Sequence, residues 1–545
     1  MCAWLGLCVL GLALLGLSLS ACRGPQLVAT PTSVPTATST STSTLVPTPT
    51  TTDTPTATAT ATATATPTAT ATATPTSTPT HTPTITSTPT PSLTPTLIQR
   101  LPPTSTPTPV TARPTATPAP ESRVQLVLVM AADSDMSGAS QTFDAVRRRG
   151  IRTLSFVSPQ AHPDFVRLSI ADGHLPGLYV AAGQDATAQV AEWEALVTRI
   201  QGLVTQRLAL ADDESAVGVL EGRGYTVVRA ANQVSGQAGE VVRLAMDKGG
   251  VQQLTSLSGA AVSNGLGLGP HVIAEQANAS PFVRPQPATN LDEFKARYLV
   301  VLDPGHTRVD NGTPIYPPIG KPVLERWSVL QRADAWAKLL QGEGWTTVLT
   351  HDDSSLFDDY AQSPDTVNDG QRSRRDDLQY RANLCYYLGV RTGRTPVVIS
   401  LHVDSQENKA KVGPLAFYAA HGDPSLLPEG KRLAEFIHNQ LVQFWVSQGI
   451  DVPGRGVLHS DTFAWDRAAE AGYTLIGNRF TLPAPGAEVL PTDVYIGVLI
   501  EAGMATHPEE AQVVATTEGN VLLAQAHHAA FLQWVEWMLA NATQP

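Results

Sequence analysis

Hydrophobic positions divide this chain into regions with different patterns. One apolar run occupies Ala3 to Ala21, and a long polar stretch rich in Thr and Pro follows it. From about Arg123 onward, short runs of Val, Ile and Leu alternate with segments in which apolar residues recur every three or four positions. The short runs predict buried strands, and the longer segments predict amphipathic helices. Such alternation predicts an α/β fold with a largely parallel sheet.

The C-terminal half shows this alternation most clearly. Strands are expected at 298–304, 346–353, 395–405 and 492–503, and helices at 323–345, 378–390, 426–449 and 518–540. In open sheets of this kind, ligands bind beyond the carboxyl ends of the strands. Polar residues at those ends are therefore the candidates for a functional site.

Two histidines and one glutamate occupy such positions, and a second glutamate opens a helix. His306, His402 and Glu501 each end a predicted strand, and Glu325 lies near the start of a predicted helix. Two histidines and one carboxylate, with a further position open to water, are a usual ligand set for catalytic zinc. Zinc lowers the pKa of a bound water to about 7, and the remaining carboxylate can act as general base and acid.

The ordered motifs around these residues resemble the zinc-dependent N-acetylmuramoyl-L-alanine amidases. They are VVLDPGH at 300–306, the glutamate in LERW at 324–327, RAN at 381–383, SLHVDS at 400–405, GRGV at 454–457 and IEAGMATHPEE at 500–510. The resemblance implies an amidase catalytic domain over residues 295–545, with a mostly parallel sheet flanked by helices. It covers nearly all of that segment in the family's order.

The resemblance also implies the roles of individual residues. His306, Glu325 and His402 would bind Zn²⁺, and Glu501 would deprotonate the zinc water and protonate the leaving amine. The substrate would be peptidoglycan, cleaved between the lactyl group of muramic acid and the L-alanine of the stem peptide. For Asp303 two roles stay open: it orients His306 through the second ring nitrogen, or it caps the turn.

Other polar residues of this half are not expected in the site. No matched motif requires a ligand at His351, His421, His459 or His507. The charge run RSRRDD at 372–377 is predicted to be a solvated loop. An inserted stretch at 354–377, and Asp404 where the family often has Asn, leave the choice of substrate open.

The segment 122–290 resembles the polysaccharide deacetylases in outline. The similar stretches are 142–157, 162–174 and 214–228. Its active site departs from that family, because Ala132 replaces the catalytic base and leaves only Asp133, while Tyr179 and Gly183 lie where a metal-binding histidine pair would fall. We therefore predict a catalytically inactive deacetylase-like domain, which binds glycan or only packs.

The N-terminal apolar run ends in small residues before Cys22, which is typical of a secretory signal. The ending LSAC resembles the lipobox of bacterial lipoproteins, which implies a signal peptide over residues 1–22 and lipidation of Cys22. The run is also just long enough to stay as an uncleaved signal anchor. In both cases the chain would lie outside the cytoplasm, and we expect a membrane-anchored lipoprotein of the cell envelope.

Residues 23–121 consist almost entirely of Thr, Pro, Ala and Ser and cannot bury an apolar core. They predict a disordered linker that spans about 3.1 Å per residue in polyproline-like form. The linker would then reach at most on the order of 300 Å, and less with chain flexibility, which suits a tether that holds a domain away from a membrane.

Charge and cysteine content bear on the possible partners and on disulfide bonds. A net charge of -12 argues against nucleic acid as a partner. Two of the four cysteines lie in the apolar leader and Cys22 is the lipid site, so Cys385 is alone and is expected to be a packed small hydrophobe. The glycine-rich stretch 264–270 is expected to be a loop.

The leading interpretation is a lipid-anchored cell-wall hydrolase whose partners are peptidoglycan and the membrane, with an activator protein left open. Two alternatives remain. One is a zinc peptidase or amidohydrolase acting on another peptide amide. The other is a non-catalytic scaffold lipoprotein that binds the cell wall, against which the complete set of two histidines and two glutamates speaks.

Overall fold

The computed structural model describes residues 124–149, 151–229, 241–246, 251–254, 262–263, 288–308, 310–354, 364–366, 372–406, 412–419, 427–460 and 495–541. The predicted signal peptide with Cys22, the predicted linker, His421 and the stretch 264–270 lie outside these residues. None of the helices in the described residues has the length and apolarity that a membrane span needs.

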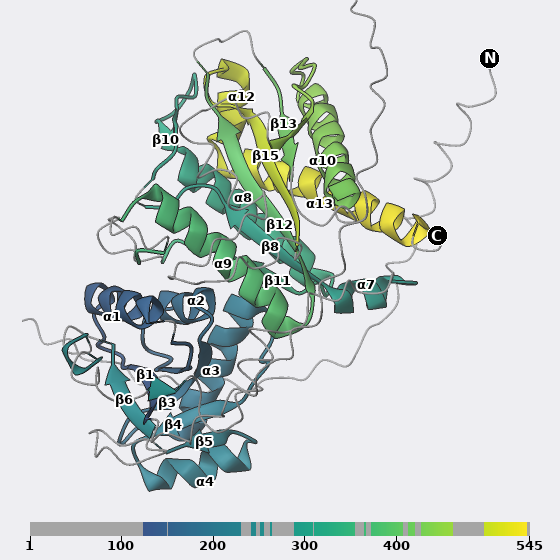
Figure 1. Ribbon diagram of the computed structural model, residues 1–545. Coiled ribbons are helices and arrows are strands. Elements are labelled where there is room, and N and C mark those ends of the chain that lie inside the picture. The colour runs from purple at the N-terminus through teal and green to yellow at the C-terminus, as the bar shows by residue number, and fades with distance from the viewer. Residues whose placement is uncertain are drawn as a thin grey trace, which may run out of the picture. The chain divides into compact units, whose positions relative to one another are not determined.

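The first α/β segment, called the middle domain below, forms a sheet in the order β5-β4-β3-β2-β1-β6, and a short β7 also pairs with β1 (Figure 1). The strands are β1 Val124–Met130, β2 Leu154–Val157, β3 Leu175–Val180, β4 Leu208–Ala211, β5 Thr226–Val228, β6 Val241–Ala245 and β7 Val262–Ser263. Helices α1 Met136–Arg148, α2 Asp164–Ala171, α3 Ala186–Gln201 and α4 Glu214–Gly222 alternate with the first five strands. Every pair of neighbouring strands is parallel.

The four helices of the middle domain pack on the same face of this sheet. Phe143 of α1, Phe165 of α2 and Trp193 of α3 share a core with Leu126 and Leu128 of β1. The alternate residues along the strands point to the other face and form a separate, smaller cluster. This follows from the strand order, because right-handed crossovers that all step in one direction place every helix on one face, as in β/α barrels.

The second α/β segment forms a six-stranded sheet in the order β11-β8-β12-β15-β13-β14. Its strands are β8 Tyr298–Pro304, β11 Thr347–Leu349, β12 Thr395–Asp404, β13 Leu415–Tyr418, β14 Val457–His459 and β15 Ile496–Met504. Strands β9 Pro314–Ile315 and β10 Val323–Leu324 form a separate hairpin. All neighbours in the main sheet are parallel except β13 and β15, which are antiparallel. This confirms the expected α/β fold with a mostly parallel sheet.

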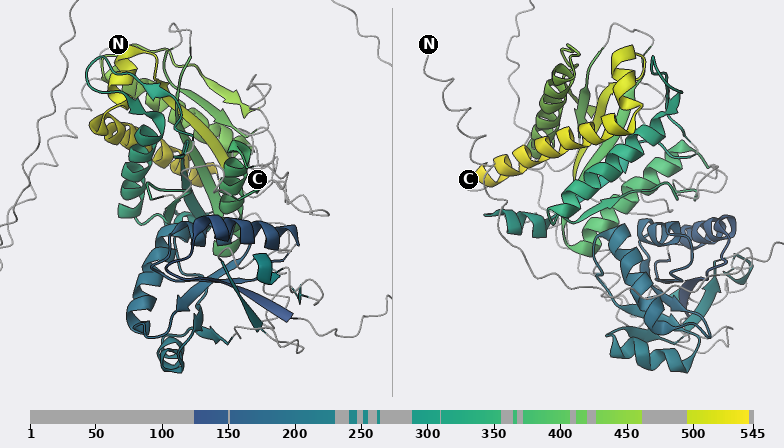
Figure 2. Two further views of the ribbon diagram at one scale, coloured as in Figure 1. Left: turned by 90° about the vertical axis from the view of Figure 1, so that its left-hand side faces the viewer. Right: turned by 180° about the vertical axis from the view of Figure 1, so that it is seen from behind.

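Helices cover both faces of this second sheet. They are α7 Leu291–Arg297, α8 Glu325–Gly342, α9 Arg374–Thr392, α10 Leu427–Ser447, α12 Pro508–Val514 and α13 Thr517–Asn541. Val300 and Leu302 of β8 face a core with α8, α10 and α13, and the last two of these helices stand out in green and yellow in Figure 2. Leu299 and Val301 point the opposite way, toward α9.

The face covered by α9 shares its hydrophobic core with the middle domain. Leu384 and Leu388 of α9 belong to the same buried cluster as Phe165 of α2 and Trp193 of α3. A polar contact adds to this core, since Arg391 donates a hydrogen bond to the backbone carbonyl of His174. The two sheets therefore contribute to one continuous apolar interior.

Each strand and helix predicted in the C-terminal half is present, with ends shifted by a few residues. The interpretation of RSRRDD as a solvated loop is wrong, because Arg374 is the first residue of α9 and both Asp376 and Asp377 are buried. Buried partners explain the error: Asp376 accepts hydrogen bonds from Ser373, and Asp377 pairs with Arg381. Cys385 is fully buried, as expected of a packed small hydrophobe, and burial raises the pKa of its thiol well above the ordinary value.

Buried histidines make the stability of this fold depend on pH. Burial, followed by the positive charges of Arg147 and Arg152, lowers the pKa of His174 from 6.5 to about 3. The folded state therefore holds this ring neutral, whereas the unfolded chain takes up a proton as the pH falls below about 6.5. The contribution of His174 to the free energy of unfolding therefore falls as the pH drops from about 6.5 to about 3, by about 1.4 kcal/mol per pH unit.

We predict that His174→Asn makes the loss of stability in acid less steep. The asparagine oxygen can still accept the hydrogen bond that the Thr153 backbone N–H donates to Nδ1 over 3.2 Å. Urea unfolding of wild type and variant between pH 4 and 7 measures the slope. An unchanged slope in a folded variant contradicts the assignment of this proton uptake to His174.

Candidate functional site

Three neighbouring parallel strands bring the candidate residues to one edge of the second sheet. His306 follows the end of β8, while His402 and Glu501 lie opposite each other in β12 and β15. The register Leu401↔Pro304 between β12 and β8 places the end of β8 beside His402. Glu325 is the first residue of α8, directly after the hairpin strand β10. The structure thus brings the predicted residues to adjacent strand ends.

The backbone around His306 is specialised for close approach. His306 adopts a φ of 70°, in the left-handed region that residues other than glycine rarely occupy. Gly305 cannot carry a side chain, because a Cβ there would overlap the His402 ring. At Gly312, whose φ is 69°, a Cβ would lie 2.6 Å from Oε2 of Glu325. Both glycines let the chain pass directly beside the ligand atoms.

Three side-chain atoms converge at the centre of the site. Nε2 of His306 lies 3.0 Å from Oε1 of Glu325. Nδ1 of His402 lies 3.2 Å from the same His306 nitrogen and 3.3 Å from the same Glu325 oxygen. A tetrahedral ion with ligand bonds of about 2.0–2.1 Å separates its ligands by about 3.3–3.4 Å. These spacings and the donor types fit zinc.

Backbone hydrogen bonds fix the Glu325 carboxylate. Oε1 accepts the Val403 N–H over 2.9 Å, and Oε2 accepts the Thr313 N–H over 2.9 Å. Burial alone would raise the pKa of Glu325, but the neighbouring His306 and His402 outweigh it and hold that pKa well below the usual range. The carboxylate is therefore ionised, as a metal ligand must be.

Asp310 lies on the outer side of His306 and was not identified from the sequence. Its Oδ2 lies 3.1 Å from Nδ1 of His306 and 2.9 Å from Nε of Arg374. Burial by itself would lower the pKa of His306, but the carboxylates of Glu325 and Asp310 raise it to about 9. A carboxylate behind a ligand histidine orients the ring. No pattern in the sequence singles out Asp310, because it lies in an irregular loop between β8 and β9.

Asp303 has a different role from the two that the sequence left open. It is fully buried and accepts hydrogen bonds from Arg381 at 2.8 and 3.0 Å, Ser400 at 2.6 Å and Thr350 at 2.6 Å. Among the described residues, none of its hydrogen bonds joins it to His306. Asp303 is a structural anchor beneath the site, and the contact with the second nitrogen of His306 belongs to Asp310.

Glu501 lies beside the three converging atoms without a hydrogen-bond partner for one of its oxygens. The Oε2 atom is buried and accepts no hydrogen bond from the described residues. Burial, followed by the negative charges of Asp404 and Glu325, raises the pKa of Glu501 well above its ordinary value. Such a carboxylate is suited to exchange a proton with a bound molecule.

An ion pair borders the site next to Glu501. Arg455, from the GRGV motif, contacts the Asp404 carboxylate. Nε of Arg455 also donates a 3.0 Å hydrogen bond to the carbonyl of Gly413. This pair ties the β12 end to the strand region around β13 and β14, and Asp404 is thereby held in place.

His351, His459 and His507 do not belong to the group of converging atoms. His351 is buried, and its Nδ1 lies 3.1 Å from the Thr350 hydroxyl. His459 packs edge-on against Tyr418, and Nδ1 of His507 lies 3.3 Å from Glu510. In the part of the chain that the structure describes, His306, Glu325 and His402 are the one group close enough to hold a metal ion.

The middle-domain residues singled out from the sequence occupy the ends of its strands. Asp133 is exposed in the turn after β1. Tyr179 donates a 2.6 Å hydrogen bond to Asp212, and the Gly183 N–H donates one of 2.6 Å to Asp213. The resemblance to deacetylases and the absence of catalysis there remain predictions.

Comparison with known proteins gives a family and several solved structures. Residues 300–533 match the family described as N-acetylmuramoyl-L-alanine amidase. No curated protein matches the chain.

Three of the similar solved structures are amidases, and the similarity to each covers 44% of this chain. The CwlD amidase of Clostridioides difficile, in complex with the GerS lipoprotein, is 19% identical over 99% of its own chain, with a TM-score of 0.31. The catalytic domain of CwlV from Bacillus (Paenibacillus) polymyxa var. colistinus is 16% identical over 98%, with a TM-score of 0.28. AmiC2 of Nostoc punctiforme is 21% identical over 98%, with a TM-score of 0.27.

The matched segment begins within β8 and ends within α13, so it contains His306, Glu325, His402 and Glu501. The C-terminal domain of this chain therefore belongs to the N-acetylmuramoyl-L-alanine amidase family.

Proposed function

We propose that this protein is a zinc-dependent amidase of peptidoglycan. It hydrolyses the amide between the lactyl group of N-acetylmuramic acid and the L-alanine of the stem peptide. The observation that carries the proposal is the convergence of one atom each from His306, Glu325 and His402, with distances of 3.0 to 3.3 Å between them. The family match over residues 300–533 supports the choice of bond.

His306, Glu325 and His402 would hold the zinc. When bound there, zinc would act as a Lewis acid toward the amide carbonyl and make a water molecule more acidic. Asp310 orients the His306 ring from behind, and the backbone N–H groups of Val403 and Thr313 orient Glu325.

Glu501 is the proton carrier in this proposal. A water oxygen attacks the amide carbon while Glu501 takes one of its protons. The C–N bond then breaks, and Glu501 gives this proton to the nitrogen of the leaving L-alanine. The raised pKa of Glu501 and its unpartnered buried Oε2 suit a group that accepts and returns a proton in one cycle.

The rest of the chain gives the reaction its proposed location. Lipidation of Cys22 would anchor the protein to the membrane on the extracytoplasmic side of the cell envelope. Residues 23–121 would act as a tether that lets the catalytic domain reach peptidoglycan. The middle domain has no catalytic role in this proposal, nucleic acid is not a partner, and an activator protein remains open.

We predict that Glu501→Gln abolishes hydrolysis and leaves zinc bound. Purified peptidoglycan is incubated with the zinc-loaded full-length protein, and the products are identified by mass spectrometry. Wild type is expected to release stem peptides that begin with L-alanine. The variant is expected to lose at least about 100-fold in rate, because general acid–base catalysis typically contributes 10²–10⁴-fold.

Two further results test the same proposal. Asp133→Asn, in the turn after β1, is expected to leave the release of stem peptides unchanged, and a large loss contradicts the inactive middle domain. Products cut at another peptide amide assign the protein to the peptidase or amidohydrolase alternative. No products at all from zinc-loaded wild type, with zinc measured in the protein, favour the scaffold alternative.

Zinc is also expected to stabilise the fold through the three ligands. A ligand that binds only the folded state adds about 2.7 kcal/mol when its concentration is 100 times the Kd. Calorimetry of chelator-treated protein should therefore show a higher Tm after zinc is restored. His306→Ala should lose this increase, whereas His459→Gln, at a ring that packs on Tyr418, should retain it. An equal increase in His306→Ala contradicts the ligand assignment.

A further inference from the structure

The Asp144 side chain of the middle domain binds the segment that precedes α9, and Arg374, the first residue of α9, contacts the loop that carries His306. We infer that the middle domain is a positioning element of the metal site: Asp144 holds Arg372, and the start of α9 then holds Arg374 against Asp310. The inference deepens the proposed function and rests on it, since Asp310 is the carboxylate that contacts His306.

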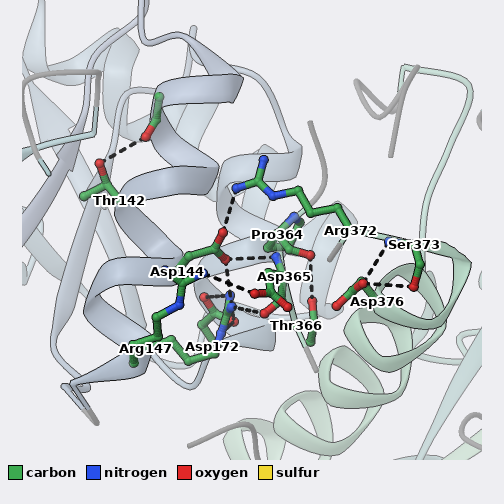
Figure 3. Close-up of polar contacts among 12 residues, drawn as sticks. Thr142, Asp144, Arg147, Asp172, Pro364, Asp365, Thr366, Arg372, Ser373 and Asp376 are labelled. Atoms are coloured by element: carbon green, nitrogen blue, oxygen red, sulfur yellow. Dashed lines mark hydrogen bonds and ion pairs between the residues drawn. The ribbon is translucent and has the colours of Figure 1, made fainter. Parts of the chain in front are cut away.

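The first contact is the Asp144 carboxylate on α1, which is almost fully buried. Its Oδ2 accepts a 2.7 Å hydrogen bond from Nη2 of Arg372, and its Oδ1 accepts a 3.0 Å hydrogen bond from the Asp365 N–H. Figure 3 shows both groups directed at Asp144 from the chain before α9. The two donors lie more than 200 positions away in the sequence.

Asp144 is itself held rigidly within the middle domain. Nη1 of Arg147 lies 2.9 Å from its Oδ1. The other side of the Arg147 guanidinium binds both oxygens of Asp172, at 2.6 to 3.0 Å. The same guanidinium donates a 3.0 Å hydrogen bond to the carbonyl of Asp365. A planar guanidinium bound on two edges leaves the Asp144 carboxylate little freedom.

A helix cap at Ser373 lies between Arg372 and Arg374 and fixes the chain there. The backbone N–H of Ser373 and its hydroxyl both donate to Oδ2 of Asp376, at 2.9 and 3.1 Å (Figure 3). The bond from the Ser373 N–H is one half of a capping box, in which the side chain three residues into a helix binds back to the cap residue. The cap fixes the backbone from 373 to 376 and so sets the points from which the Arg372 and Arg374 side chains extend.

The last contact reaches the metal site. Nε of Arg374 lies 2.9 Å from Oδ2 of Asp310, and the same oxygen lies 3.1 Å from Nδ1 of His306. His306 has the strained φ of 70°, a conformation that persists only where surrounding contacts hold the residue in place. Arg374 is half-exposed and would sample other positions without the fixed cap.

A second connection follows a separate route to the same loop. Arg167 of α2 is buried and binds Asp352 at 2.6 Å. The adjacent residue, Asp353, accepts a 2.9 Å hydrogen bond at its carbonyl from Arg308, two residues after His306. The middle domain thus contacts two separate chain segments that bind the His306 loop: the residues after β11 and the start of α9.

The test measures zinc affinity of the full-length protein by competition with a chromophoric chelator. Asp310→Asn is expected to weaken zinc binding by about 10- to 100-fold, as is usual when the partner of a ligand histidine is lost. Asp144→Asn and Arg372→Gln are each expected to weaken it by roughly 2- to 30-fold, the range for coupling through intermediate residues. The double variant is expected to bind zinc no more weakly than the more impaired of the two single variants, because both changes break the same contact.

Arg148→Gln is the matched control, because Arg148 lies on the same helix and pairs with Asp365 at 3.1 Å, beside the route from Asp144 to Arg374. It is expected to keep wild-type zinc affinity. Urea unfolding of each metal-free variant separates folding from positioning. Arg372 is partly exposed, so its variant remains informative even where Asp144→Asn fails to fold.

Three results would overturn the inference. The first is wild-type zinc affinity, within about twofold, in both Asp144→Asn and Arg372→Gln while Asp310→Asn weakens binding. The second is an equal loss in Arg148→Gln, which indicates general loosening of the interface. The third is additivity in the double variant. If the wild type binds zinc but releases no stem peptides, the proposed function is wrong, and the positioning role of the middle domain is not affected.

Discussion

The buried ion pair between Asp303 and Arg381 is the contact from which the catalytic edge is built. The carboxylate also accepts hydrogen bonds from Thr350 and Ser400, so it joins β8 to α9, to the end of β11 and to β12. Leaving one partner of such a pair buried and alone typically costs about 3–5 kcal/mol. Because Asp303 lies three residues before His306, it fixes the point at which the chain leaves the sheet. The convergence of His306 with His402 depends on that point.

Negative charge is the second constraint on the site. Asp404 and Glu325 both oppose ionisation of Glu501, and Asp310 stands behind His306. Arg455 and Arg374 offset part of this charge from the borders. The centre itself is lined by two imidazoles and by the ionised carboxylate of Glu325, a combination that favours a cation. The geometry and the electrostatics thus point to the same kind of occupant.

The elements and the candidate ligands could be predicted because they follow from local patterns. Apolar runs mark the strands, and parallel strands bring their carboxyl ends to one edge, so His306, His402 and Glu501 could be grouped from the sequence alone. Glu325 was a candidate from its place at the start of a predicted helix, but its role as a ligand depended on the family resemblance. Asp310 could not be identified in this way, since a contact within an irregular loop leaves no periodic signal. The charge run RSRRDD was wrongly predicted to be a solvated loop, because the carboxylate that binds Arg372 lies on a helix 228 positions away in the sequence.

The hydrophobic core shared by α9 and the middle domain bears on whether the catalytic segment can be produced alone. Leu384 and Leu388 pack into the same cluster as Phe165 and Trp193, so the α9 side of the catalytic sheet does not close over its own residues. A fragment of this chain that held the catalytic segment alone would expose this apolar surface to water. Exposed apolar patches of that kind favour aggregation. The two sheets are therefore best produced together, although each has the outline of a separate domain.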